Sequence, residues 1–80
     1  MLFRIINTNE DSANYLVCKY PILTEYGYVI VDDDLWGKVG YININSLIEL
    51  IEFCKKLDRE IIITNYGDAL TIEIYDYWRE

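Results

Sequence analysis

The sequence predicts a single α+β domain, residues 1–80, in which one helix covers one face of an antiparallel sheet of about five to six strands. Three observations lead to this prediction. Eighty residues leave room for only one hydrophobic core. Residues 46–57 repeat their apolar side chains at the spacing of a helix, whereas residues 70–78 alternate apolar and polar side chains as a half-buried strand does. The expected order of elements is β-β-β-β-α-β-β.

The first half of the chain is predicted to consist of strands. Residues 2–6 form a short apolar run, and residues 7–14 carry the turn formers and charges of a loop. Residues 15–23, YLVCKYPIL, are rich in aromatic and β-branched residues and predict a second strand, with Pro21 at its edge or end. Residues 24–32 and 38–44 predict the next two strands. Gly37 suits the turn that joins them, and Gly40 is a candidate bulge.

The second half of the chain predicts one capped helix followed by a hairpin. Ser46 and Glu49 have the spacing of a capping box, in which the hydroxyl accepts from a helical amide and the carboxylate reaches back. The expected apolar face, which Phe53 widens, is formed by Leu47, Leu50, Ile51, Cys54 and Leu57. Residues 59–66 and 70–78 then form two strands, and the short turn between them makes them an antiparallel hairpin.

The second face of such a sheet must be solvated or bound to a partner, because one helix covers only one face. Alternation places Glu73 and Tyr75 opposite the apolar side chains of the last strand, and it separates Tyr26 and Tyr28 from the neighbouring valines. We therefore expect an open face rich in tyrosine, with carboxylates among the rings, that suits an interface. The alternative is that cross-strand tyrosine pairs only stabilise an exposed sheet.

The charge of the chain narrows the classes of partner. Fourteen acids and seven bases give a net charge of −7 with no histidine, and such a field repels nucleic acid and attracts basic surfaces. The chain has no long apolar run and begins without the apolar core of a signal peptide. We expect a cytoplasmic protein that binds neither membrane nor nucleic acid directly and has no cofactor. The alternative is that the charge only keeps a small apolar domain soluble.

The acidic run VDDDLW, residues 31–36, has the oxygen ligands that calcium or magnesium prefers. The spacing argues against a metal site, because Asp32, Asp33 and Asp34 are contiguous and a strand would point the middle one away from the other two. An EF-hand loop also ends in a glutamate at its twelfth position, where this chain has Asn43. We expect no metal here.

Catalysis is not expected either. The chain has no histidine to act as a base, its four glycines are isolated, and no serine or cysteine has an evident base near it in sequence. Carboxylate pairs such as Glu73 and Asp76 are the groups that glycoside hydrolysis uses, but a domain of this size has little volume for a deep pocket. The sequence therefore predicts a binding protein and not an enzyme.

Residues 43–80 carry a resemblance to known proteins. The segments INSLIELIEFCKKLDREIIIT and LTIEIYDYWRE resemble the C-terminal half of small acidic proteins encoded by phages and mobile elements of Firmicutes. Some small phage proteins of similar size and charge are anti-CRISPR proteins, several of which mimic DNA to block the effector. The resemblance covers roughly half of the chain and implies an inhibitor in a bacterial host cell. It assigns no individual functional residue.

The leading hypothesis is a phage-type inhibitor, anti-CRISPR-like, that binds a basic surface of a host nuclease effector and obstructs nucleic-acid access. Asp32, Asp33 and Asp34 would imitate backbone charge beside the anchor Trp36. The second group of interface candidates is Glu73, Tyr75, Asp76 and Trp78.

Two alternatives belong to other classes. The first is a sponge or sensor for a small nucleotide signal, which would require the bases Arg4, Lys19, Lys38 and Arg59 to cluster. The second is a self-assembling subunit, such as a homodimer, whose open sheet edge or face pairs with itself.

Overall fold

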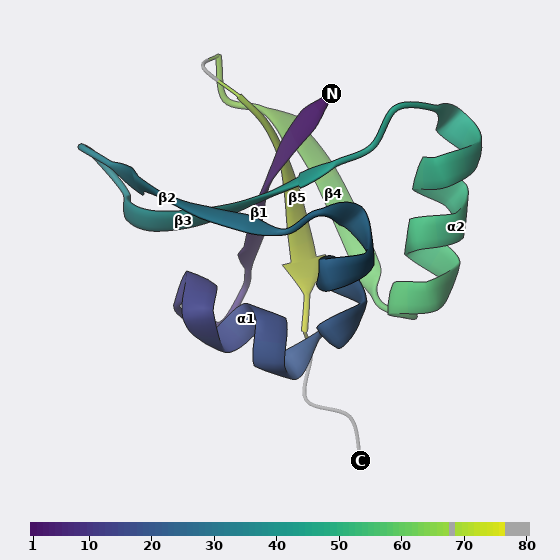
Figure 1. Cartoon of the computed structure of the whole chain (residues 1–80), viewed down its shortest axis with the longest axis horizontal. Helices are drawn as coiled ribbons and strands as arrows, with labels where there is room; N and C mark the ends of the chain where they lie inside the picture. The colour runs from purple at the N-terminus through teal and green to yellow at the C-terminus, as the bar shows by residue number, and fades with distance from the viewer. Residues whose placement is uncertain (68, 77–80) are drawn as a thin grey trace.

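The computed structural model describes residues 1–67 and 69–76 and has an α+β fold, with the helices packed against one face of a five-stranded sheet (Figure 1). The sheet has the strand order β2-β3-β1-β5-β4. Its strands are β1 (Leu2–Asn7), β2 (Val29–Asp33), β3 (Gly37–Asn43), β4 (Glu60–Asn65) and β5 (Leu70–Tyr75). The helical elements are α1 (Ala13–Lys19), the 3-10 helix η1 (Pro21–Tyr26) and α2 (Leu47–Leu57). None of the helices in the described ranges has the length and apolarity needed to cross a membrane.

The prediction of a second strand at residues 15–23 is wrong, because this segment forms α1 and the start of η1. Ser12 begins α1, and its hydroxyl accepts a hydrogen bond from the backbone N–H of Tyr15. The buried residues Ala13, Leu16 and Tyr20 are separated by three and four positions, which is helical spacing. The aromatic and β-branched content suggested a strand, and the apolar period overrides it.

The sheet is mixed. The prediction of a purely antiparallel sheet is therefore wrong. β1 pairs with β3 in the antiparallel direction and with β5 in the parallel direction, with Phe3 opposite Leu70. The first strand therefore lies in the middle of the sheet and joins the β2–β3 hairpin to the β4–β5 hairpin (Figure 1). Both hairpins were predicted. The edges of the described sheet are β2 and β4.

Helix α2 agrees with its predicted bounds and cap. The Ser46 hydroxyl accepts from the Glu49 N–H at 3.1 Å, and the Glu49 carboxylate accepts from the Asn45 N–H at 2.8 Å. The buried face differs from the expected one, since Phe53 and Leu57 are buried whereas Leu47 is 71% exposed. The sheet therefore covers only part of the apolar surface that α2 offers.

The predicted tyrosine-rich open face is also wrong for Tyr26 and Tyr28. Both rings pack against the core on the helix side of the sheet. Tyr26 meets the edge of Phe53, with ring centroids 5.1 Å apart. The hydroxyl of Tyr28 donates to the carbonyl of Ala13 at 2.8 Å. The strand predicted for residues 24–32 begins only at Val29, since Tyr26 ends η1 and Tyr28 precedes β2, so strand alternation does not decide where these rings point. Both lie on the covered side, because α1 and η1 extend the core over it.

The face opposite the helices is closed in its middle. Arg4 and Thr71 are opposite each other on β1 and β5, and both side chains are buried. The Trp36 ring lies over the Arg4 guanidinium, 4.9 Å from ring centroid to Cζ, and contacts the ring of Tyr66. Trp36 is the last residue of the β2–β3 turn and Tyr66 follows β4, so the ends of the two hairpins meet over Arg4.

Candidate functional site

The tip of the β2–β3 hairpin is folded by one of its aspartates. The carboxylate of Asp33 accepts hydrogen bonds from the backbone N–H groups of Leu35 and Trp36 at 2.8 and 3.0 Å. Gly37 has a φ of 76°, a left-handed conformation that favours glycine, and it is opposite Asp33 in the ladder. Asp33 therefore shapes the turn through one oxygen of its own side chain, Oδ1.

The other two aspartates project from this tip. Asp32 is opposite Lys38, with Oδ1 to Nζ 3.4 Å and both side chains mostly exposed, so this pair adds little stability. Asp34 is exposed, and Leu35 beside it is 90% exposed. We call Asp32, Asp34 and Leu35 the hairpin tip. It presents two carboxylates and one apolar side chain at the end of the hairpin, with Lys38 beside Asp32.

Trp36 holds this tip in place. Its ring is 48% exposed, and its contacts with Arg4 and Tyr66 attach the hairpin to the opposite end of the sheet. A guanidinium stacked on an indole is a favourable cation–π contact, more so where the cation is shielded from water. Trp36 was predicted as an anchor for a partner. The structure gives it an internal contact and leaves half of its surface outside.

A cavity of about 440 Å³ lies between the β2–β3 hairpin and the loop that joins β1 to α1. Trp36 and Lys38 line it from the hairpin, and Glu73 lines it from β5. The loop contributes Glu10, which is exposed, and Asp11, whose carboxylate accepts from the Asn7 amide at 2.7 Å. The cavity thus combines an aromatic wall with three carboxylates and one lysine. Sequence reasoning missed Glu10 as a site residue, because a long-range approach of two loops brings it here.

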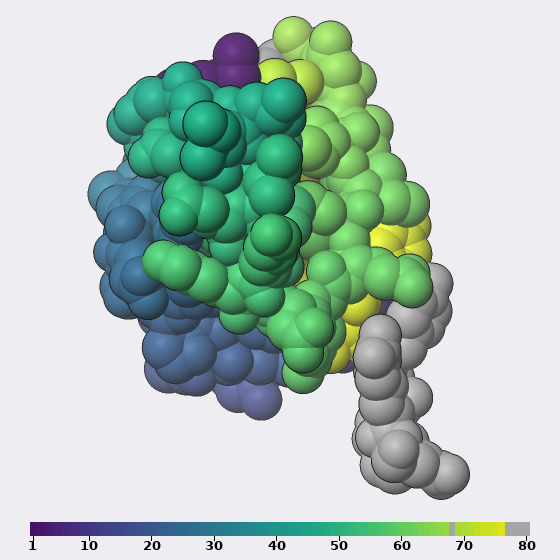
Figure 2. Space-filling view, turned by 90° about the vertical axis from the view of Figure 1, so that its right-hand side faces the viewer, coloured from purple at the N-terminus to yellow at the C-terminus, as the bar shows by residue number. Residues whose placement is uncertain are grey.

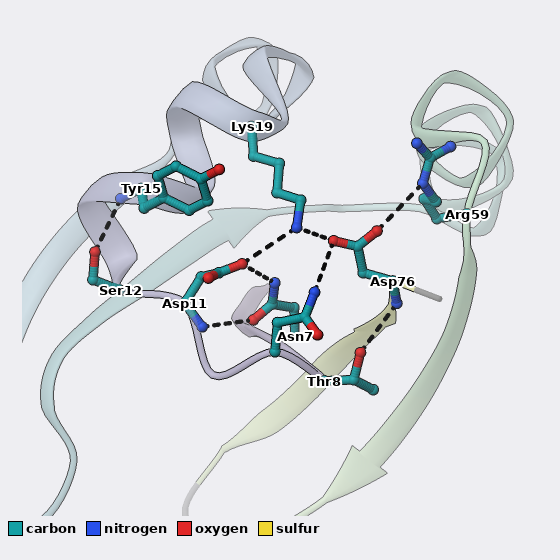
Figure 3. A network of polar contacts seen from close by, with 9 residues as sticks. Asn7, Thr8, Asp11, Ser12, Tyr15, Lys19, Arg59 and Asp76 are labelled. Atoms are coloured by element: carbon teal, nitrogen blue, oxygen red, sulfur yellow. Dashed lines mark hydrogen bonds and ion pairs between the residues drawn. The ribbon is translucent and has the colours of Figure 1, made fainter. Parts of the chain in front are cut away.

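Asp76 is at the centre of a polar network that shares Asp11 with the cavity, because the ammonium of Lys19 lies 3.3 Å from the Asp11 carboxylate and also pairs with Asp76 (Figure 3). Its carboxylate pairs with the ammonium of Lys19 and lies 3.9 Å from Nε of Arg59. The Asp76 backbone N–H donates to the hydroxyl of Thr8 at 3.1 Å. The Asp76 side chain is only 11% exposed, and these contacts join the end of β5 to α1 and to the start of β4. Asp76 was predicted as an interface residue, and in the structure its carboxylate contacts Lys19 and Arg59 of the same chain.

The network shifts the pKa values of its members. The hydrogen bond from Lys19 lowers the pKa of the Asp76 carboxyl, although burial acts against this. The same bond raises the pKa of Lys19. Burial, followed by the nearby Asp76, raises the pKa of the Tyr20 hydroxyl. A lowered folded pKa means that ionised Asp76 stabilises the native state.

Asp76→Asn is expected to lower the free energy of unfolding at pH 7 by about 1–2 kcal/mol, because Lys19 loses its charged partner. In the native protein this contribution is fully present above the ordinary carboxyl value of 3.8 and is lost as pH falls through the lower folded pKa. Urea unfolding at a series of pH values measures it. The variant should show a shallower loss of stability in acid, whereas Asp34→Asn on the exposed tip should change stability at pH 7 by less than about 0.5 kcal/mol. Equal stabilities of Asp76→Asn and the unmodified chain would contradict the structural role.

The second predicted group of interface residues does not form one patch. Glu73 and Tyr75 are half-buried on β5, and Glu73 lines the cavity while Tyr75 is opposite Glu60 of β4. Asp76 contacts Lys19 of α1, on the helix side of the sheet. Trp78 lies outside the described residues. Among the described members of this group, Glu73 alone lines the cavity beside the hairpin that carries the first group.

The structure adds no metal candidate. Within residues 1–67 and 69–76, no three or more acidic or cysteine side chains gather closely enough to hold a metal ion. In the acidic run, Asp33 accepts a hydrogen bond from the backbone of the turn, and Asp32 lies beside Lys38.

Comparisons of the chain with protein-family models, with curated proteins and with solved structures find no match. The function proposed next therefore depends on the geometry of the chain and on the resemblance that residues 43–80 carry.

Proposed function

We propose that this chain is a small acidic inhibitor that binds a basic, nucleic-acid-binding surface of a host nuclease, with a CRISPR effector as the favoured class. The hairpin tip would make the contact and obstruct nucleic-acid access. The observation that carries this proposal is the exposure of Leu35, 90%, directly after the exposed Asp34 and close in sequence to the exposed Asp32, on a turn that Asp33 and Trp36 hold in one shape. A preorganised tip loses little conformational entropy on binding.

The chemistry of the tip and of the cavity suits a basic partner. Carboxylates that precede an apolar side chain speed association with a positive groove, and the apolar side chain then slows dissociation. The cavity beside the tip has room for a lysine or arginine side chain of the partner between Glu10, Glu73 and the Trp36 ring. A cation at that place would gain both charge pairing and a cation–π contact. The resemblance of residues 43–80 to small acidic phage proteins supports the class of partner.

The nucleotide sponge is less well supported, because the bases it requires are not gathered. Lys38 is beside Asp32, and Lys19 and Arg59 both lie against Asp76. Arg4 is buried beneath Trp36 on the other face of the sheet. Each of these four basic side chains therefore lies beside a carboxylate or under an aromatic ring, and not in a common anion-binding site. This arrangement favours a basic partner over a phosphate ligand.

The test measures DNA cleavage by a panel of purified RNA-guided nucleases with and without the chain. We expect inhibition of at least one effector. The triple variant Asp32→Asn, Asp34→Asn, Leu35→Ser should raise the concentration needed for half-inhibition by about tenfold or more, since two charges and the apolar anchor are lost together. Rising salt should slow the association of the unmodified chain more than that of the variant.

The control carries the same change in charge on another surface. Glu25→Gln with Glu52→Gln removes two exposed carboxylates at η1 and α2 and should inhibit as well as the unmodified chain. Equal inhibition by the tip variant and the unmodified chain would remove the hairpin from the proposal. If the tip variant and the Glu25→Gln, Glu52→Gln variant lose inhibition equally, net charge alone, and not the tip, governs binding.

A further inference from the structure

β4 is an edge strand that lacks the usual features that keep edges unpaired. Its six residues, Glu60–Asn65, pair with β5 in one continuous register from Glu60 opposite Tyr75 to Asn65 opposite Leu70, so it has no bulge. It contains no proline and no lysine, and three isoleucines follow one another. Natural edge strands are commonly interrupted or charged, because their free backbone groups can pair with another chain. The other edge, β2, ends in two aspartates.

Apolar side chains accompany this open edge on both sides. Ile62 and Ile63 point to opposite faces of the sheet and are 46% and 43% exposed. Helix α2 lies beside β4 on one face of the molecule (Figure 2), and its Ile48 and Ile51 are 71% and 46% exposed. Exposed isoleucines therefore occur both on the open edge strand and on the helix beside it. A partner strand would find apolar surface next to backbone donors and acceptors.

The charge of this region fits a second copy of the chain. Residues 47–65 hold four acids and three bases, so the region is nearly neutral within a chain of net charge −7. Two such chains repel each other over most of their surfaces and least here. Antiparallel pairing of β4 with its copy, centred on Ile62 or on Ile63, places Glu60 opposite Thr64 or Tyr66 of the copy. No like charges then oppose each other in the new ladder.

We propose that the chain forms a symmetric homodimer in which β4 pairs antiparallel with β4 of a second copy and the exposed part of α2 packs beside the joint. The two five-stranded sheets become one continuous sheet of both chains. A two-fold axis that runs between the two copies of β4, at the middle of their pairing, gives an isologous interface, which closes and cannot grow into a filament. The β2–β3 hairpins then lie at the two far ends of the combined sheet, where both tips stay accessible. This inference does not depend on the proposed partner.

The test is sedimentation of the unmodified chain from low micromolar to several hundred micromolar concentration at physiological salt. The expected species has about twice the chain mass of 9.5 kDa at the upper end of the series. Ile62→Lys should raise the dimer dissociation constant by about tenfold or more, since it places an ammonium in the middle of the joint. Ile48→Lys on α2 should weaken the dimer without touching the strand, which keeps the test valid if Ile62→Lys unfolds the chain.

The matched control is Val31→Lys on β2, the other edge. Val31 is 43% exposed, close to the value for Ile62, and it receives the same charge in the same kind of strand. This variant should dimerise like the unmodified chain. A chain that stays monomeric throughout the concentration series would overturn the proposal. So would dissociation by Val31→Lys with an intact dimer in Ile62→Lys and Ile48→Lys.

Discussion

Phe53→Ala is expected to lower the free energy of unfolding by about 3–5 kcal/mol, a large share of the stability of a small domain. Phe53 is fully buried and is the side chain by which α2 enters the core. Its ring meets the edge of Tyr26 in η1, so the substitution loses apolar contact, leaves a cavity and separates α2 from η1. Urea unfolding followed by far-ultraviolet circular dichroism measures the loss.

The control for this substitution lies on the same helix. Ile48 is 71% exposed, so Ile48→Ala should change the free energy of unfolding by less than about 0.5 kcal/mol at protein concentrations where the chain is monomeric. Comparable losses in the two variants would mean that α2 does not pack on the sheet through Phe53. That result would contradict the arrangement of the core.

Gly40→Ala is expected to cost about 2–4 kcal/mol, although the change adds only one methyl group. The ring of Tyr28 crosses the sheet directly over Gly40, and an added Cβ would overlap its hydroxyl end. Tyr28 would have to leave this place and give up the hydrogen bond from its hydroxyl to the Ala13 carbonyl. Thermal and urea unfolding of the variant provide the measurement.

A double-mutant cycle separates this clash from the general effect of replacing a glycine. In a Tyr28→Ala chain, Gly40→Ala should cost less than about 0.5 kcal/mol or should stabilise, because the obstructing ring is gone and alanine suits a strand better than glycine. An undiminished cost in the Tyr28→Ala chain would show that the ring is not the reason for glycine at position 40.

The parts of the fold that were predictable are those decided by neighbours in sequence. The cap of α2 requires Ser46 and Glu49, three residues apart, and the β2–β3 turn lies where Gly37 predicted it. Helix α1 also had local signals, in the Ser12 cap and the spacing of Ala13 and Leu16, but aromatic and β-branched content outweighed them in the prediction. Propensity is a weaker guide there than periodicity.

The parts that were not predictable depend on contacts between distant residues. β1 pairs in parallel with β5 across more than sixty positions, and no local pattern encodes that neighbour. Gly40 was taken for a bulge, whereas the register on both of its sides is regular and the glycine admits the Tyr28 ring. The joining of Trp36 to Arg4 likewise depends on how the two hairpins curve toward each other.

The position of the candidate site was predictable from the sequence. The structural roles of its individual residues were not. The run at residues 32–34 does lie at the turn end of the β2–β3 hairpin, but the three aspartates are not equivalent, because Asp33 accepts the two backbone N–H groups that close the turn. Leu35 was overlooked, although an apolar residue between aspartates and a turn glycine is the signal that would have identified it. Asp76 looked like a surface acid in sequence, and its partners Lys19 and Arg59 come from distant segments.

The central claim is that the hairpin tip is the surface that meets the partner, and side-chain oxidation by hydroxyl radicals tests it most directly. The chain is oxidised alone and in complex with the nuclease it inhibits, and the products are located by mass spectrometry. The account predicts that oxidation of Leu35, 90% exposed in the chain alone, falls several-fold in the complex while Tyr15 on α1, 52% exposed, is unaffected. Protection of Tyr15 with Leu35 still fully reactive would contradict it.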